Sequence, residues 1–261
     1  MDILYSLTWD AADPNTDMYG AQINYSADGV VEYQNELQPA GKKIHWWSTK
    51  LPEDTPQSIG YGSKLLPQIP RHERYHLMLD AEIEPAKSVG LLVASYDAQG
   101  QLDKEKMELD QELDFELGEN AHDYEIALEK FNNEKVTFRR MYVIPTSLWD
   151  EMTIEPRADV PAVDLLPRQD RGDPSGTGNL MIRTEKRVVD SAPLDAELLH
   201  DPLRIVRVPS RWSALQLADV LQEFKDRYNL KNVNCWADDD TTQKLMSEAQ
   251  ALMLKRKKGI L

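Results

Sequence analysis

Short segments of alternating apolar and polar residues fill the first part of the chain. From Tyr75 to Ile83 the odd positions are apolar and most even positions are polar, which is typical of a strand with one buried face. Turn signals such as Ser26-Ala27-Asp28-Gly29 separate similar segments. The pattern predicts strands at 2–9, 21–25, 29–33, 44–48, 75–83, 89–97, 113–117, 124–131 and 136–144.

No convincing helix lies between these segments, so they predict a mainly β fold. The charge-rich stretch 102–112 fits an exposed strand, a helical turn or a loop. Many short strands separated by turns are typical of an antiparallel β-sandwich or jelly roll. We therefore expect such a domain over residues 1–150.

The pattern changes in residues 151–202. This stretch is rich in glycine, aspartate and proline, with prolines at Pro156, Pro161, Pro167, Pro174 and Pro193. Proline removes a backbone donor and interrupts helices and central strands. We expect a linker or irregular structure here, with at most a short strand at Leu180–Arg183.

Residues 203–261 show a third pattern. Leu203–Val208 and Val233–Trp236 fit strands. Ser213 can cap a helix whose apolar side chains recur at helical spacing, and Thr241 or Thr242 can open a second one. The apolar positions of the two helices are Leu217, Leu221, Phe224, Tyr228, Leu245, Met246, Ala249, Leu252 and Met253. This order predicts a small β-α-β-α unit.

Charge is concentrated at the N-terminal end. The chain carries a net charge of −15, and residues 1–150 hold 27 acidic and 13 basic residues. An acidic domain repels phosphate backbones, so nucleic acid is a poor partner. The run Lys255-Arg256-Lys257-Lys258 fits either peripheral contact with anionic lipid or a basic complement to a helix C-terminus.

Targeting signals and cysteines indicate the compartment. The sequence has no apolar run long enough to span a bilayer and no signal peptide at its start. Its one cysteine, Cys235, allows no intramolecular disulfide, which favours a reducing environment. We expect a cytoplasmic protein with at most peripheral membrane association.

Catalytic and cofactor motifs are missing from the sequence. It has no Gly-x-Ser-x-Gly elbow, no phosphate-binding loop and no Gly-x-Gly-x-x-Gly turn. His72 and His76 are four residues apart, but they fall at a predicted strand, where this spacing does not bring them together. An enzyme built on residues 203–261 would lack the usual glycine-rich turn. We expect no catalytic residue, no cofactor and no metal.

The segment Ile44-His45-Trp46-Trp47-Ser48 is the most informative local feature. Adjacent residues on a strand point to opposite faces, so one tryptophan should enter the core and the other should face outward. An outward aromatic can stack on a sugar ring or an apolar peptide. Alternatively, neighbouring strands or a partner domain cover both tryptophans.

The same region resembles a known family, the third accessory secretory protein of the accessory Sec system. The resemblance covers about residues 5–145 and departs from the family pattern at Ala40 and Trp46. The matching positions, in order, are Tyr19, Gly20, Tyr33, Asn35, Leu37, Pro39, Gly41, Ile44, His45, Trp47, Leu66, Pro67, Tyr96, Asp97 and Gly100. Residues after about 155 match nothing in this pattern, so we expect them to be a lineage-specific extension.

The resemblance implies a cytoplasmic, non-enzymatic export component with a sandwich like that of carbohydrate-binding modules. Its partners would be two sister accessory proteins, one glycosyltransferase-like and one acetyltransferase-like, and the accessory SecA motor. The exported preproteins would be serine-rich glycosylated adhesins. For residues 203–261, which the resemblance does not cover, we expect a docking element.

Two ways of binding remain open for such a protein. A preprotein segment can pair with an exposed sheet edge, or exposed aromatics can stack on sugars, in which case the domain is an independent carbohydrate-binding module. Candidate contacts for a substrate or partner are Trp46, Trp47, His45 and Tyr19.

Overall fold

The computed structural model describes residues 2–10, 15–50, 66–168, 176–185 and 188–257. The chain divides into two compact units. Residues 3–146 and 186–192 form one of them, here called the sandwich unit. Residues 1–2, 147–185 and 193–261 form the other, here called the C-terminal unit.

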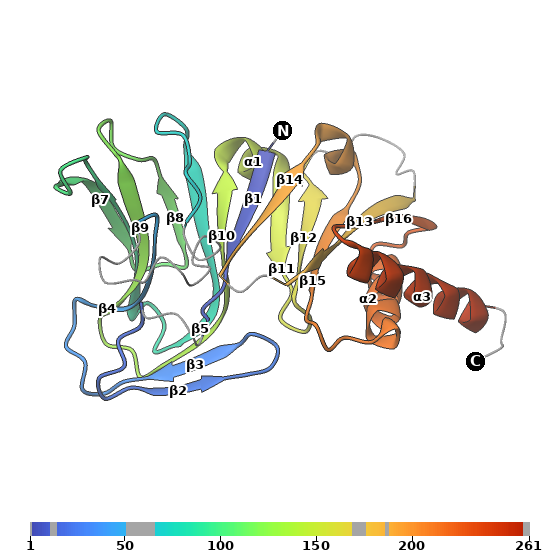
Figure 1. The fold of residues 1–261 in the computed structure, drawn as a ribbon, viewed down its shortest axis with the longest axis horizontal. Helices are drawn as coiled ribbons and strands as arrows, with labels where there is room; N and C mark the ends of the chain where they lie inside the picture. Colours follow the sequence, from blue (N-terminus) through green and yellow to red (C-terminus); the bar gives the residue numbers. More distant parts are fainter. Residues whose placement is uncertain (1, 11–14, 51–65, 169–175, 186–187, 258–261) are drawn as a thin grey trace. The chain divides into compact units, whose positions relative to one another are not determined.

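Two sheets make up the sandwich unit (Figure 1). The four-stranded sheet has the order β4-β9-β6-β7, and the seven-stranded sheet has the order β14-β1-β10-β3-β2, with β5 on β10 and β8 on β5. The pairs among β1–β10 are antiparallel, which confirms the predicted fold class. The strands are β1 (Asp2–Leu7), β2 (Gln22–Tyr25), β3 (Val31–Gln34), β4 (Lys42–Ser48), β5 (Tyr75–Glu84), β6 (Val89–Tyr96), β7 (Leu102–Glu108), β8 (Glu112–Phe115), β9 (Asp123–Lys130), β10 (Lys135–Pro145) and β14 (Val189–Leu194).

The core of this unit lies between the two sheets. Leu77 and Leu79 of β5 face it, as the period-two pattern predicts. In β10 the phase changes: Phe138 and then Met141 face the core, because the register with β5 shifts between Phe138 and Arg140. Such a bulge moves the following side chains to the other face, which explains the less regular pattern of this strand.

A five-stranded sheet forms the centre of the C-terminal unit, in the order β11-β12-β15-β13-β16. The prediction of irregular structure over 151–202 is therefore wrong. The strands are β11 (Met152–Pro156), β12 (Ala162–Pro167), β13 (Thr177–Thr184), β15 (Leu203–Val208) and β16 (Asn232–Ala237). The helices are α1 (Thr146–Glu151), α2 (Ala214–Arg227), α3 (Asp240–Lys257) and a 3-10 helix at Ala196–His200.

The prolines misled the prediction because they occupy positions that strands tolerate. Pro156 and Pro167 are the last residues of β11 and β12, and Pro161 precedes β12. Pro193 lies in β14, an edge strand, where a missing donor costs little.

The predicted β-α-β-α elements are present. A capping box at Ser213 and Gln216 opens α2, and apolar side chains of α2 and α3, such as Phe224 and Met246, pack on Leu180 and Val206 of the sheet. However, β13 lies between β15 and β16 and is parallel to both. Residues 203–261 thus share their sheet with strands from 151–184. Among the described residues, none of the helices combines the length and apolar content needed to traverse a membrane.

Candidate functional site

Two of the expected contact residues, His45 and Trp47, lie in the core of the sandwich unit. They are 0 % and 1 % exposed. The His45 ring stacks on Trp9 at 4.6 Å and meets the Trp47 ring edge-on at 4.4 Å. The Trp47 indole donates to the Thr8 carbonyl at 2.9 Å. This corrects the expectation that His45 and Trp47 contact a partner: they hold the core together.

Local strand geometry explains their burial. β4 has a register shift between Lys43 and His45, so that Ile44 and His45 both point inward. Alternation then resumes, with Trp47 inside and Trp46 outside. The His45 Nδ1 and the Thr16 hydroxyl are 2.8 Å apart, which satisfies a polar atom inside the core.

Trp46 lies on the outer face of the four-stranded sheet. It is partly exposed and pairs with Ala127, which pairs with Leu92, which in turn pairs with Met107. These four residues cross all four strands as one apolar row, and Met107 remains 39 % exposed. We call this face, with its surrounding charges, the outer face.

Charged residues surround the row. Lys43 pairs with Glu125, and Glu105 and Glu129 lie close enough to act on each other's charges. Burial raises the pKa of Glu129; Lys43 opposes this rise, and Glu105 and Glu125 reinforce it. A partly exposed indole beside carboxylates and an ammonium offers both a stacking surface and hydrogen-bonding groups.

Tyr19 is far more exposed than Trp46, at 81 %. It lies in a turn that follows residues 15–17, which run along the edge of β4 through Trp46 N to Asn15 O and Asp17 N to Ile44 O. The structure thus brings His45 and Trp47 together and places Trp46 and Tyr19 on separate surface features.

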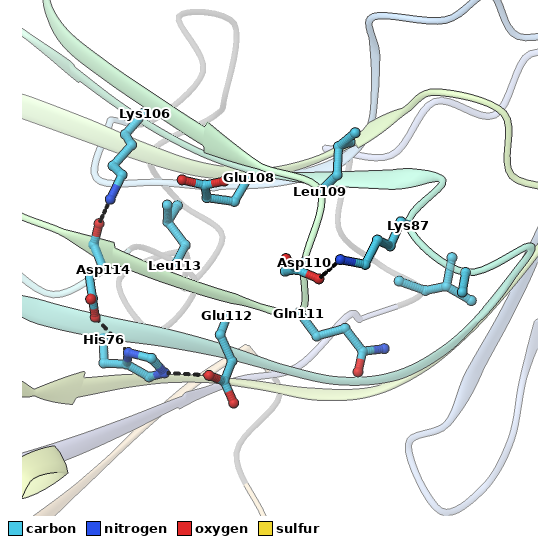
Figure 2. Close-up of a pocket in the computed structure, with 12 residues that line it drawn as sticks. His76, Lys87, Lys106, Glu108, Leu109, Asp110, Gln111, Glu112, Leu113 and Asp114 are labelled. Atoms are coloured by element: carbon cyan, nitrogen blue, oxygen red, sulfur yellow. Dashed lines mark hydrogen bonds and ion pairs between the residues drawn. The ribbon is translucent and has the colours of Figure 1, made fainter.

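A groove lies between β7 and β8, the edge strands of the two sheets (Figure 2). Its cavity holds about 680 Å³ and is lined by both strands and by His76. His76 Nδ1 lies 2.7 Å from Asp114, Lys87 pairs with Asp110 at 2.8 Å, and Lys106 donates to the Asp114 carbonyl at 2.7 Å. The sequence carried a signal for this groove in its charge-rich stretch 102–112, but not the fact that the two strands belong to different sheets.

These charges connect the two sheet edges. Two residues before Lys106 in β7, Lys104 pairs with Glu116 at 2.7 Å. Each lysine of β7 therefore contacts either β8 or the residue that follows it. The hydrogen bond from Lys106 to the Asp114 carbonyl satisfies a backbone acceptor of β8, an edge strand. We interpret the groove as a structural closure of the sandwich.

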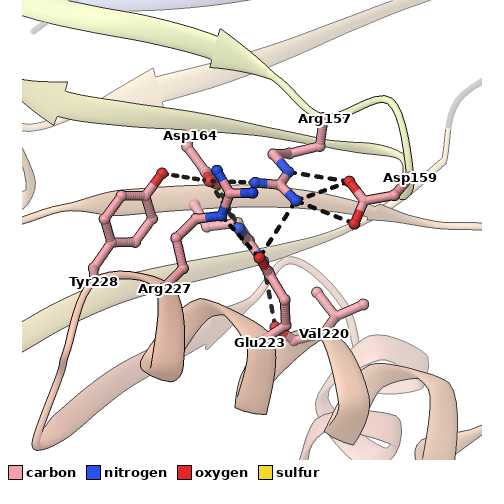
Figure 3. A network of polar contacts seen from close by, with 8 residues as sticks. Arg157, Asp159, Asp164, Val220, Glu223, Arg227 and Tyr228 are labelled. Carbon is pink, nitrogen blue, oxygen red and sulfur yellow. Dashed lines mark hydrogen bonds and ion pairs between the residues drawn. The ribbon is translucent and has the colours of Figure 1, made fainter.

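The C-terminal unit contains a buried charge network (Figure 3). Arg204 and Asp164 are both fully buried and form a bidentate pair with distances of 2.6 and 2.7 Å. The Tyr228 hydroxyl donates to Asp164 at 2.9 Å, and Glu223 accepts from Arg157 at 3.3 Å, from Arg227 at 2.9 Å and from Arg204. Burial opposes ionisation of Glu223, but the arginines outweigh it and lower its pKa. Because the charges compensate one another, we interpret the network as structural.

The basic run at the C-terminus forms the last turn of α3. Lys255, Arg256 and Lys257 lie there, and Arg256 pairs with Asp219 of α2 at 2.7 Å. Lys258 lies outside the described residues. Cations in this position complement the helix dipole. The described residues also contain no group of three His, Cys, Asp or Glu that could hold a metal ion.

Comparison with known proteins connects this fold to one family. The family described as Accessory Sec secretory system ASP3 matches residues 16–144. Two curated relatives carry the name of the same accessory Sec system protein: one from Staphylococcus aureus, 26% identical over 52% of this chain and 41% of its own length, and one from Streptococcus gordonii, 27% identical over 47% of this chain and 75% of its own length. The chain thus spans about two fifths of the length of the staphylococcal relative.

A solved structure extends the likeness beyond the matched segment. A chain of the Glycosylation Associate Protein (Gap123) complex from Streptococcus agalactiae superimposes with a TM-score of 0.51 and 17% identity, covering 90% of this chain and 70% of that one. At 90% coverage the likeness in fold includes residues after 155, so the expectation of a lineage-specific extension is wrong at the level of fold. The sandwich over residues 16–144 belongs to the accessory Sec secretory system ASP3 family.

Proposed function

We propose that this chain is a non-enzymatic component of an accessory Sec export complex, in which it holds sister accessory proteins together and contacts the preprotein. The observation that carries this proposal is the family match over residues 16–144, which coincides with the sandwich unit. The fold likeness to a chain of the Gap123 complex supports a role in an assembly.

The proposed partners are those that the family resemblance implies. They are a glycosyltransferase-like and an acetyltransferase-like sister protein, the accessory SecA motor and a serine-rich adhesin preprotein, all met in the cytoplasm. The described surface features suit binding. On the outer face, Lys43 pairs with Glu125 next to the apolar row that begins at Trp46. This arrangement offers contact area and no activated nucleophile.

Deletion of the gene in its host tests the proposal. Surface fractions blotted for the serine-rich adhesin should lose the mature protein, and the full-length gene supplied in trans should restore it. Adhesin at the wild-type level on the surface of the deletion strain would overturn the proposal.

A second candidate function is glycan binding at the outer face. The specific observation is Trp46, a partly exposed indole in a row with Met107 and paired with Ala127, which Glu125 and Glu129 flank on β9. Flat sugar faces stack on aromatic rings, and carboxylates accept hydrogen bonds from sugar hydroxyls. The exported adhesins of the proposed system are glycosylated, which would give such a surface a use.

Calorimetric titration of the full chain with N-acetylglucosamine oligomers tests this candidate. Saturable heat should disappear in Trp46→Ala and persist in Trp236→Ala, which removes a 41 % exposed tryptophan of the C-terminal unit. Trp47 is unsuitable for this test because its removal damages the core. If the wild-type chain gives no heat of binding, glycan binding is overturned and only the scaffolding role remains.

A further inference from the structure

Among the described residues of the sandwich unit, the most exposed large apolar side chains lie on two adjacent loops. Met18, Tyr19 and Leu37 are 60 %, 81 % and 70 % exposed. Met18 and Tyr19 lie in the turn before β2, and Leu37 lies in the loop after β3. The loops touch, since a Cβ atom added to Gly20 would lie 3.0 Å from Cδ1 of Leu37. We call these three residues the apolar patch.

Buried polar side chains fix both loops from beneath. Asn35 is 1 % exposed; its amide donates to the Tyr19 carbonyl at 2.9 Å, and its Oδ1 accepts from the amides of Leu37 at 3.1 Å and Gln38 at 3.0 Å. The Tyr19 amide in turn donates to Asp17 at 3.0 Å. The backbone of Tyr19 is therefore held on both sides.

Further contacts tie this support to the sheets. The side-chain amide of Gln38 donates to the Asp17 carboxylate and to the Lys43 carbonyl, both at 2.8 Å. The Lys130 ammonium donates to the Asn35 carbonyl. Fully bonded buried networks fix one conformation. A rigid surface that presents apolar side chains binds a partner at a lower entropic cost than a mobile loop does.

We propose that the apolar patch is the docking surface for a sister accessory protein, whose own face supplies an apolar hollow with lysine or arginine at its rim. This inference rests on the proposed function. Large exposed apolar side chains grouped together mark interaction sites. Glu36 precedes Leu37 in the chain and is exposed, whereas Lys130, which contacts the same loop, is buried. The charge exposed next to Leu37 is therefore negative and favours a basic partner.

Charge also argues against a second copy as the occupant. Residues 1–150 hold 27 acidic and 13 basic residues, so two such units would repel each other when brought face to face. A partner with a basic rim gains both burial of the apolar patch and electrostatic attraction.

The test compares two double variants of the full chain. Tyr19→Ser/Leu37→Ser removes the two most exposed side chains of the apolar patch, and Leu102→Ser/Leu254→Ser removes two other exposed side chains, 55 % and 60 % exposed. The dissociation constant with the purified pair of sister accessory proteins is measured by calorimetry. We expect a loss of about tenfold or more for the first variant and no change for the second. Unchanged circular dichroism and melting temperature show that both variants fold.

A charge variant tests the expected attraction between Glu36 and the basic rim of the partner. Glu36→Lys should weaken association at 50 mM NaCl and have a smaller effect at 500 mM, because salt screens exposed charges.

The remaining outcomes separate the two proposals. If the wild-type chain binds the sister proteins and Tyr19→Ser/Leu37→Ser binds equally well, the docking surface is overturned and the proposed function stands. If the wild-type chain does not bind them at all, both are overturned. If light scattering shows a wild-type dimer that the variant abolishes, the occupant is a second copy and the commitment to a sister protein is wrong.

Discussion

Trp46 and Trp47 show how far one residue position decides a role. They are neighbours in β4, but Trp47 is 1 % exposed and Trp46 is partly exposed. Alternation along a strand predicts that they separate, and it cannot say which one is buried. That choice depends on the register shift beside His45, which follows from pairing with β9 and leaves no local signal.

Replacement of the two tryptophans should therefore have unequal effects on stability. Trp47→Ala removes ring contacts with His45 and Phe138 and a hydrogen bond to Thr8, and we expect a loss of about 3–5 kcal/mol in the free energy of unfolding. Trp46→Ala should cost about 1 kcal/mol. Guanidinium unfolding followed by near-ultraviolet circular dichroism measures both. Equal losses would contradict the assignment of Trp47 to the core.

His45 should make stability depend on pH. Burial lowers the pKa of His45 to about 3, against a small opposing effect of a hydrogen bond with the Asn15 backbone. Below about pH 6.5 the imidazole of His45 binds a proton in the unfolded chain but stays neutral in the folded chain. The free energy of unfolding therefore falls as the pH falls from about 6.5 towards 3. The slope due to this group is at most about 1.4 kcal/mol per pH unit.

Unfolding measured between pH 7 and pH 5 isolates this effect from carboxyl groups, which titrate lower. His45→Gln should flatten the slope in this window. The matched control is His122→Gln, because the side chain of His122 is 62 % exposed and its replacement leaves the core around His45 intact, so the contribution of His45 to the slope should remain. If His45→Gln keeps the wild-type slope, the histidine is not held neutral by the fold.

At the scale of elements, local pattern predicted most strands of the sandwich and both long helices. It failed where an element's identity depends on a distant partner. β7 alternates charged residues on both faces, and only its place beside β6 at the sheet edge makes it a strand. β11, β12 and β14 are short and contain prolines, so their assignment as strands depends on their pairing partners.

The ion pair that joins β12 to β15 provides a test at this scale. Asp164→Leu leaves Arg204 buried without its bidentate partner, and we expect a loss of about 3–5 kcal/mol. The double variant Asp164→Leu/Arg204→Met should cost less than Asp164→Leu alone, since it removes the uncompensated charge as well. Ellipticity at 222 nm reports on this unit, which contains α2 and α3. Additive losses would show that the two charges act independently.

For the whole molecule, the sequence predicted a boundary near residue 150, and the structure shows a chain that crosses between its units more than once. β14 returns from residue 189 to pair with β1 in the seven-stranded sheet. Val188, only 1 % exposed, belongs to the core of the sandwich unit, and its carbonyl accepts from Thr8 at 2.8 Å. Because this return comes after a long excursion of the chain, residues 147–185, into the C-terminal unit, no local pattern could have indicated it.

A fragment of residues 1–150 should therefore be an incomplete sandwich. It lacks Val188 and leaves β1 as an open edge, so we expect unfolding free energy to fall by about 2 kcal/mol or more, the value of one buried valine side chain plus the lost strand, and self-association to increase. A peptide of residues 188–194 added in trans should restore stability in proportion to its concentration, because it binds only the folded fragment. The same peptide carrying Val188→Asp is the control and should restore less, since it would bury an unpaired carboxylate. A fragment as stable as the sandwich within the full chain would show that β14 adds nothing to the fold.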